Sequence, residues 1–171
     1  VAFALVLVIV RLGVVQAVGR CRTLIHYLRR SPMERSETAT KLLSSIEEKR
    51  AIIGVMGLGY VGLPLAVTFA EEGFQVVGFD VDSDKAEQIN SGVSYIDDVP
   101  DADVAHVVQS GQLSATTDMS RLAEPDVICI CVPTPLRKTR DPDMSFVTQA
   151  VEAIAGVHRA GQLVILESTT Y

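Results

Sequence analysis

From about residue 36 onward, runs of consecutive apolar residues alternate with segments in which apolar residues recur at helical spacing. The apolar runs are short, as is typical of strands buried on both faces, and they predict strands at 51–56, 75–79, 113–117, 127–132 and 163–166. The amphipathic segments predict helices at 41–48, 63–72, 84–90, 101–109 and 145–155. Strands that alternate with helices form βαβ units, so the pattern predicts an α/β fold with a parallel sheet and flanking helices.

The amino-terminal segment follows neither pattern. Val1–Val10 is wholly apolar, and the apolar stretch continues to Gly19 with only two interruptions. As a membrane helix the stretch is borderline in length, and an arginine inside it costs about 2.5–3.5 kcal/mol. A signal peptide is also poorly matched, because no basic residues precede the apolar stretch. We therefore expect residues 1–32 to be a non-native or dispensable extension, with a weak membrane anchor or a packed helix as the alternatives. Residues 33–50 are then a leading helix, and residues 51–171 form the folded domain.

The composition fits a single domain, because 171 residues with 48% apolar content can bury a core of ordinary size. The net charge is −6, but residues 51–171 hold 17 acidic against 6 basic side chains. Such an acidic domain would repel a phosphate backbone, which argues against nucleic acid as a partner. The cysteines form no C-x-x-C pair and the histidines lie far apart, so the sequence predicts no metal site and favours a reducing, cytoplasmic compartment.

The clearest chemistry follows the first predicted strand, where a G-x-G-x-x-G motif precedes a helix. In that setting Gly57 permits a tight turn, Gly59 lets the backbone approach a pyrophosphate, and Gly62 lets the helix pack closely on the sheet. The helix amino terminus favours the pyrophosphate charge. Asp80 ends the next strand, where its carboxylate can accept hydrogen bonds from a ribose diol and would repel a 2′-phosphate. The motif therefore predicts a Rossmann-type domain that binds NAD rather than NADP.

Longer stretches around this motif resemble a known family. Five of them occur in order at familiar spacings: Ile53–Ala66 (IGVMGLGYVGLPLA), Gly78–Asp80 (GFD), Thr116–Asp118 (TTD), Cys131–Pro135 (CVPTP) and Glu167–Thr169 (EST). Together they resemble the amino-terminal NAD-binding domain of the UDP-glucose/GDP-mannose dehydrogenase family. Two further segments, Leu42–Ile53 and Leu166–Tyr171, look most similar to the branch that acts on UDP-N-acetylhexosamines. The resemblance implies an oxidoreductase that converts the C6 alcohol of a nucleotide sugar to a carboxylate, giving a uronate, in two NAD-dependent steps. A cysteine nucleophile captures the intermediate aldehyde in that family.

The resemblance also implies roles for individual residues. The pyrophosphate is expected on Gly57, Gly59, Tyr60, Val61 and Gly62. The adenosine is expected on Asp80 and Lys85, and the nicotinamide side is expected to be lined by Thr117, Val132 and Thr134. Thr134 is also expected to orient water or the sugar oxygen as a supporting catalytic residue. Glu167 lies beside the family's acidic position after the last strand, with a solvent-facing strand-end acid as the alternative.

The family's catalytic cysteine lies beyond Tyr171, which implies a Rossmann domain truncated at its carboxyl end. Cys129 and Cys131 are expected to pack inside a buried strand, where a thiol has a raised pKa and no access to substrate. We therefore expect the chain to bind NAD without turnover by itself. A homo-oligomer with a nucleotide-sugar substrate is expected only of the complete enzyme.

Two other functions compete with a dehydrogenase. A membrane-tethered nucleotide-sensing regulatory domain would share the glycines and Asp80 but would have no need of the segment Val132–Pro135. A Rossmann-like scaffold without any ligand would need neither the glycine motif nor Asp80, so the presence of both argues against it.

Overall fold

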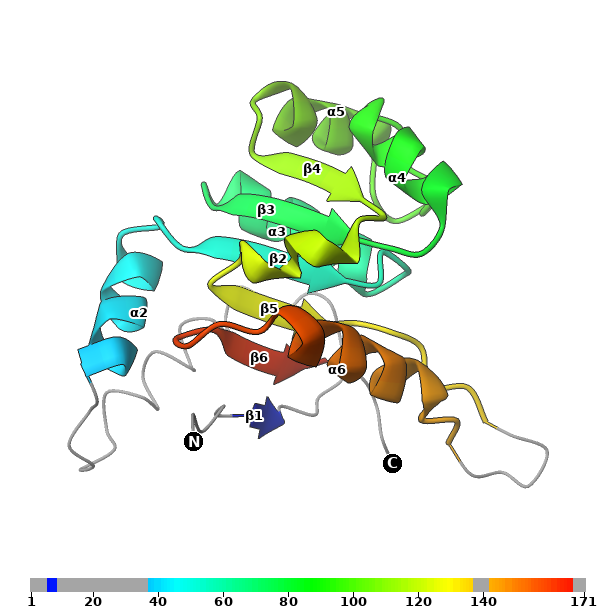
Figure 1. Ribbon diagram of the computed structural model, residues 1–171. Coiled ribbons are helices and arrows are strands. Elements are labelled where there is room, and N and C mark those ends of the chain that lie inside the picture. Colours follow the sequence, from blue (N-terminus) through cyan, green and yellow to red (C-terminus); the bar gives the residue numbers. More distant parts are fainter. Residues whose placement is uncertain (1–5, 9–36, 137–141, 168–171) are drawn as a thin grey trace.

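The computed structural model describes residues 6–8, 37–136 and 142–167, which form a parallel sheet with helices on both faces (Figure 1). The strands are β1 (Val6–Val8), β2 (Ile52–Met56), β3 (Gln75–Phe79), β4 (Leu113–Thr116), β5 (Val127–Ile130) and β6 (Leu163–Leu166). They lie in the order β1-β6-β5-β2-β3-β4, and every neighbouring pair is parallel. The predicted fold class and all five predicted strands are confirmed.

The predicted helices are also present, with ends that differ by a few residues from those expected. They are α2 (Glu37–Glu47), α3 (Gly62–Glu71), α4 (Ser83–Asn90), α5 (Asp101–Gln109) and α6 (Ser145–Val157). A 3-10 helix, η2 (Met119–Ala123), was not predicted. The Asp118 carboxylate caps its start by accepting a hydrogen bond from the Ser120 N–H at 3.0 Å. The segment is short and polar, so its sequence pattern does not indicate a helix.

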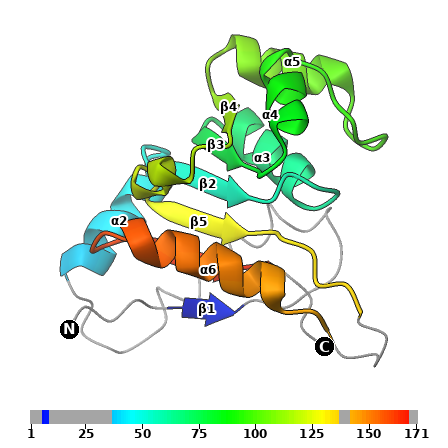
Figure 2. The ribbon, with the colours of Figure 1, turned by 45° about the vertical axis from the view of Figure 1, so that its right-hand side comes forward.

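The core lies in two layers, one on each side of the sheet (Figure 2). On one side the strands pack against α2, α3, α4 and α5, and on the other side they pack against η2 and α6. Side chains of one strand divide between the layers: in β5, Val127 and Cys129 face the first layer, and Ile128 and Ile130 face the second. This double burial is why the strands read as continuous apolar runs.

An additional edge strand comes from the amino-terminal segment. β1 pairs with β6 in parallel register, with Val6 opposite Val164 and Val8 opposite Leu166. No pattern along the chain predicted this strand, because three residues inside a long apolar run have no recognisable strand boundary. The rest of residues 1–32 lies outside the described residues, so the expectation of a dispensable extension or anchor stays a prediction. Within residues 37–136 and 142–167, no helix has the length and apolar character needed to span a membrane.

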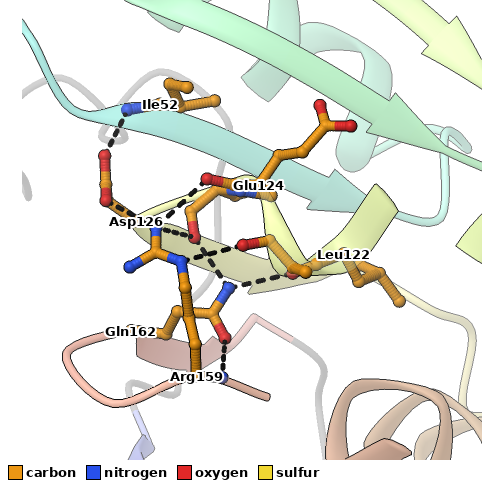
Figure 3. A network of polar contacts seen from close by, with 8 residues as sticks. Ile52, Leu122, Glu124, Asp126, Arg159 and Gln162 are labelled. Atoms are coloured by element: carbon orange, nitrogen blue, oxygen red, sulfur yellow. Dashed lines mark hydrogen bonds and ion pairs between the residues drawn. The ribbon is translucent and has the colours of Figure 1, made fainter. Parts of the chain in front are cut away.

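A polar network joins the strands at their amino ends (Figure 3). Arg159 donates to main-chain carbonyls of residues 123–125 and, at 2.7 Å, to Asp126 Oδ1. Asp126 Oδ2 accepts from the Ile52 N–H at 3.0 Å, at the start of β2. Gln162, only 6% exposed, donates to two carbonyls of the same segment. The network fixes the chain entering β5 against the turn before β6.

Candidate functional site

The sheet topology makes the carboxyl ends of β2 and β5 the expected place for a ligand. From β2 the chain proceeds to β3 and β4 on one side and then crosses to β5 on the other side. The connections that follow β2 and β5 therefore lead to opposite sides of the sheet, and the carboxyl ends of two such strands are where parallel α/β sheets bind ligands. These two loops comprise residues 57–61 and 131–136, which include most of the predicted site residues.

Two of the glycines are required by the backbone itself. Gly57 has a φ of +88°, and its N–H donates to the Phe79 carbonyl at 2.7 Å, so the chain turns sharply at the end of β2. A Cβ on Gly62 would lie 1.8 Å from the Gly57 carbonyl oxygen. The first turn of α3 can therefore pack on the loop only because residue 62 has no side chain, as the motif predicts.

The third glycine has a different environment. A Cβ added to Gly59 would meet no atom within 4 Å, so this position borders open space. Among the hydrogen bonds of the described residues, none is donated by the N–H groups of Gly59, Tyr60 or Val61, and no side chain caps α3. Three unpaired N–H groups at a helix amino terminus are the arrangement that binds phosphate groups.

The Tyr60 and Val61 side chains are exposed, at 76% and 46%. Both residues follow Gly59 directly, and the donors that they can offer to an anion are their N–H groups and the Tyr60 hydroxyl.

Asp80 lies at the end of β3 and is only 7% exposed. Its Oδ2 accepts from the Leu58 N–H at 2.8 Å, and its Oδ1 accepts from the Asp82 N–H at 3.1 Å. Lys85 Nζ lies 3.5 Å from Oδ2. A carboxylate can accept about four hydrogen bonds, so these contacts leave acceptor capacity for a ligand hydroxyl. Asp80 thus holds the glycine loop in addition to any contact that it makes with a ligand.

Tyr95 also contacts the loop, and the sequence did not indicate it. Its hydroxyl donates to the Leu58 carbonyl at 2.5 Å, and Lys85 Nζ lies 5.9 Å from the centre of its ring. Burial, followed by the charges of Asp80 and Asp82, raises the pKa of the Tyr95 phenol, so the group stays protonated and donates. No motif could have identified Tyr95, because it lies in an irregular segment between α4 and α5.

Val132 and Thr134 lie in the second loop, and both are half-buried. A Cβ on Gly57 would lie 3.2 Å from the Val132 nitrogen, so the two loops touch. The Glu167 N–H donates to the Ile130 carbonyl at 2.8 Å, which places this half-buried residue at the carboxyl end of β6. Val132, Thr134 and Glu167 thus follow the neighbouring strands β5 and β6.

Thr117 is placed differently from the other residues predicted to line the nicotinamide side. It is exposed and follows β4, and β3 and β2 separate β4 from β5. Thr116, the preceding residue, accepts a hydrogen bond from the Asp80 N–H at 3.2 Å. The sheet order therefore places Thr117 near Asp80 and gives no support for grouping it with Val132 and Thr134.

The two cysteines of β5 and its end are buried, as predicted. Cys129 is 3% exposed and Cys131 is 8% exposed. Burial, followed by the charge of Glu167, raises the pKa of Cys131 to about 12. Because the thiolate is the nucleophilic form of cysteine, this environment makes Cys131 unreactive near neutral pH. Its Cβ instead packs beside Gly62.

Comparison with known proteins finds a family model and many relatives. The model of the UDP-glucose/GDP-mannose dehydrogenase family, NAD binding domain, matches residues 51–171. The UDP-N-acetyl-D-mannosamine dehydrogenase of Pyrococcus horikoshii is 44% identical over 119 residues, which cover 68% of this chain and 28% of that protein. The UDP-N-acetyl-D-glucosamine 6-dehydrogenase of Pseudomonas aeruginosa is 38% identical, over 70% of this chain and 27% of that protein.

A solved structure agrees with these matches. The structure of the UDP-D-ManNAc dehydrogenase from Pyrococcus horikoshii superimposes with a TM-score of 0.65 and 42% identity, over 69% of this chain and 28% of that one. The chain thus spans about 28% of the length of the curated relatives that it matches. The residues that match the family model include both loops, 57–61 and 131–136.

Proposed function

Because the chain belongs to the UDP-glucose/GDP-mannose dehydrogenase family and carries its NAD-binding domain, we propose that it provides the NAD site of a nucleotide-sugar 6-dehydrogenase. The relatives named above act, by their names, on UDP-N-acetyl-D-mannosamine and UDP-N-acetyl-D-glucosamine. A UDP-N-acetylhexosamine is accordingly the proposed substrate class. The proposed reaction oxidises its C6 alcohol to a carboxylate in two steps, with NAD accepting a hydride in each.

The observation that carries this proposal is the open side of Gly59 next to three unpaired N–H groups at the start of α3. A pyrophosphate fits there because it is anionic and needs close approach of a backbone without a side chain. Asp80, buried beside the same loop, retains acceptor capacity for the hydroxyls of a ribose. The residues present therefore fit NAD.

The remaining site residues take roles along the same ligand. Lys85, held near Asp80, faces the adenosine end of the proposed site. Val132 and Thr134 follow the strand next to β2 and are assigned to the nicotinamide end, where Thr134 also orients water or the sugar oxygen. Glu167 follows β6, the strand next to β5, and is assigned to the same end. The assignment leaves Thr117 to the adenosine side.

The oxidation is proposed to depend on a cysteine outside the matched segment. Neither Cys129 nor Cys131 suits the task, because both are buried and the pKa of Cys131 is raised to about 12. The 171 residues alone should therefore bind NAD without oxidising a UDP-sugar. Buried, reduced thiols suit a reducing compartment, and we place the enzyme in the cytoplasm on that ground. The homo-oligomer is assigned to the complete enzyme.

Calorimetric titration of the chain with NAD and NADP tests the site. The Asp80 carboxylate would repel a 2′-phosphate, so NAD should bind at least about tenfold more tightly, which corresponds to about 1.4 kcal/mol. In Asp80→Asn the negative charge is lost, and the preference for NAD should narrow. Glu152→Gln, which removes the same charge from the exposed side of α6, should leave the preference unchanged. Equal binding of NAD and NADP by the unaltered chain would contradict the role of Asp80.

A further inference from the structure

Tyr95 makes a contact with the glycine loop that the family motifs do not include. It lies in the segment between α4 and α5, and its hydroxyl reaches back 37 residues to donate to the Leu58 carbonyl at 2.5 Å. Its ring is partly buried and packs against the main core cluster. A buried phenol donating to a main-chain carbonyl of a ligand-binding loop can control the orientation of that loop.

Leu58 is fixed at three points. Its N–H donates to Asp80 Oδ2 at 2.8 Å, and its carbonyl accepts from Tyr95. Its side chain is fully buried and packs so closely over Gly78 that a Cβ there would lie 2.8 Å from Leu58 Cδ2. The backbone on both sides of Leu58 therefore has little freedom. The carbonyl of the next residue, Gly59, accepts from the Leu63 N–H at 3.0 Å, and its N–H points to the open side of the loop.

Peptide geometry carries the effect of Tyr95 to Gly59. In a planar trans peptide the carbonyl of one residue and the N–H of the next point in opposite directions. The Leu58 carbonyl is directed at the Tyr95 hydroxyl, so the Gly59 N–H is directed away from Tyr95. Within the described residues this N–H donates to no protein acceptor. We propose that Tyr95 is a positioning residue for the dinucleotide, since its hydroxyl sets the orientation in which the Gly59 N–H meets the pyrophosphate.

The segment that carries Tyr95 is well suited to hold a fixed position. The Ser94 N–H donates to Asp101 Oδ1 at 2.7 Å, and the Ile96 N–H donates to Ser94 Oγ at 3.1 Å. Ile96 and Val99 are each 6% exposed and anchor the segment in the core. Tyr95 thus presents its hydroxyl from a rigid support before any ligand arrives, which lowers the cost of ordering the loop on binding.

Substitution of Tyr95 by phenylalanine removes the hydroxyl and retains the ring, so the packing of the ring and its contact with Lys85 are kept. We would titrate the 171-residue chain with NAD, with ADP-ribose and with adenosine, the first two by calorimetry and adenosine by ligand-observed NMR. NAD and ADP-ribose contain the pyrophosphate, whereas adenosine does not. Ser110→Ala is the matched control, because Ser110 Oγ donates to the Val107 carbonyl at 3.0 Å at the opposite end of α5.

Loss of one hydrogen bond that orients a donor should raise the dissociation constants of NAD and ADP-ribose about three- to tenfold in Tyr95→Phe. The affinity for adenosine and the melting temperature should change no more than in Ser110→Ala. Unchanged binding of NAD by Tyr95→Phe, or an equal loss for all three ligands, would overturn the positioning role. This role rests on the proposed function, whose own failure would be distinct: the unaltered chain would then bind neither NAD nor ADP-ribose.

Discussion

Alanine at Gly59 and at Gly62 should have opposite effects on the free energy of unfolding, although both positions belong to the same short motif. At Gly59 the added methyl group meets no atom within 4 Å, whereas at Gly62 it lies 1.8 Å from a carbonyl oxygen of the backbone. Gly59 therefore constrains what can approach the loop from outside, and Gly62 constrains how the loop packs on α3. The pair separates a ligand-binding role from a structural role.

For Gly59→Ala the expected change in stability is small. The backbone there does not have a positive φ, so alanine fits, and the reduced freedom of the unfolded chain is expected to add about 0.4–1 kcal/mol to the free energy of unfolding. The same methyl group lies where the proposed pyrophosphate approaches the N–H groups of the loop. We expect NAD affinity to fall at least about tenfold, or about 1.4 kcal/mol.

For Gly62→Ala the structure must move. The 1.8 Å separation falls far short of the 3.4 Å at which ordinary contact begins, and the facing atom is main chain rather than a flexible side chain. The start of α3 or the turn at Gly57 must shift, and overpacking of this kind costs about 1–3 kcal/mol. NAD affinity should fall as well, because the shift displaces the N–H groups at the start of the helix.

Urea unfolding followed by circular dichroism gives the free energy of unfolding, and calorimetry gives the dissociation constant for NAD. Gly156→Ala is the control: it lies in α6, where a Cβ meets nothing within 4 Å, and should gain about 0.5–1 kcal/mol with unchanged NAD affinity. If Gly59→Ala bound NAD as tightly as the unaltered chain, the proposed approach of the pyrophosphate would be wrong. If Gly62→Ala unfolded at the same urea concentration as the unaltered chain, the packing argument would be wrong.

Three further predictions concern stability. Burial raises the pKa of Cys131 to about 12, so the protonated thiol contributes to the free energy of unfolding below the unfolded thiol pKa of about 8.5, and this contribution is lost as the pH rises toward 12. Between about pH 8 and pH 10.5, urea unfolding should therefore show a smaller fall in the free energy of unfolding for Cys131→Ala than for the unaltered chain. Arg159→Met removes the hydrogen bonds to the Ala123 and Glu124 carbonyls, so the free energy of unfolding should fall by about 1–3 kcal/mol while NAD affinity stays unchanged. A change in affinity would link that network to the site. Asn90→Ala removes the two hydrogen bonds that the side-chain amide makes with Ala115 in edge strand β4, so the free energy of unfolding in urea should fall by about 1–2 kcal/mol. The edge strand should also become freer to pair with another molecule, and light scattering should show more self-association. An unchanged scattering profile would contradict this role of Asn90 in protecting the edge.

Much of the site could be predicted because its signals are local. The glycines at 57, 59 and 62 have fixed spacing from the end of β2, and Asp80 ends the next strand, so the parallel topology brings them together. The structure gives no support for grouping Thr117 with Val132 and Thr134, because that prediction had no local signal. It depended on which strands are neighbours, and residues 113–132 contain no local sign that β4 and β5 lie on opposite sides of β2 and β3.

The sequence by itself determined the fold class, the order of strands and helices along the chain and the glycine turn, because periodicity and backbone constraints act over a few residues. The tertiary structure decided the contacts that join distant segments: the Tyr95 hydroxyl on Leu58, the second task of Asp80 in holding the loop, and the pairing of β1 with β6. A hydrogen bond across 37 residues depends on how distant segments of the chain pack together on one side of the sheet, and a local pattern of apolar and polar residues carries no record of that packing.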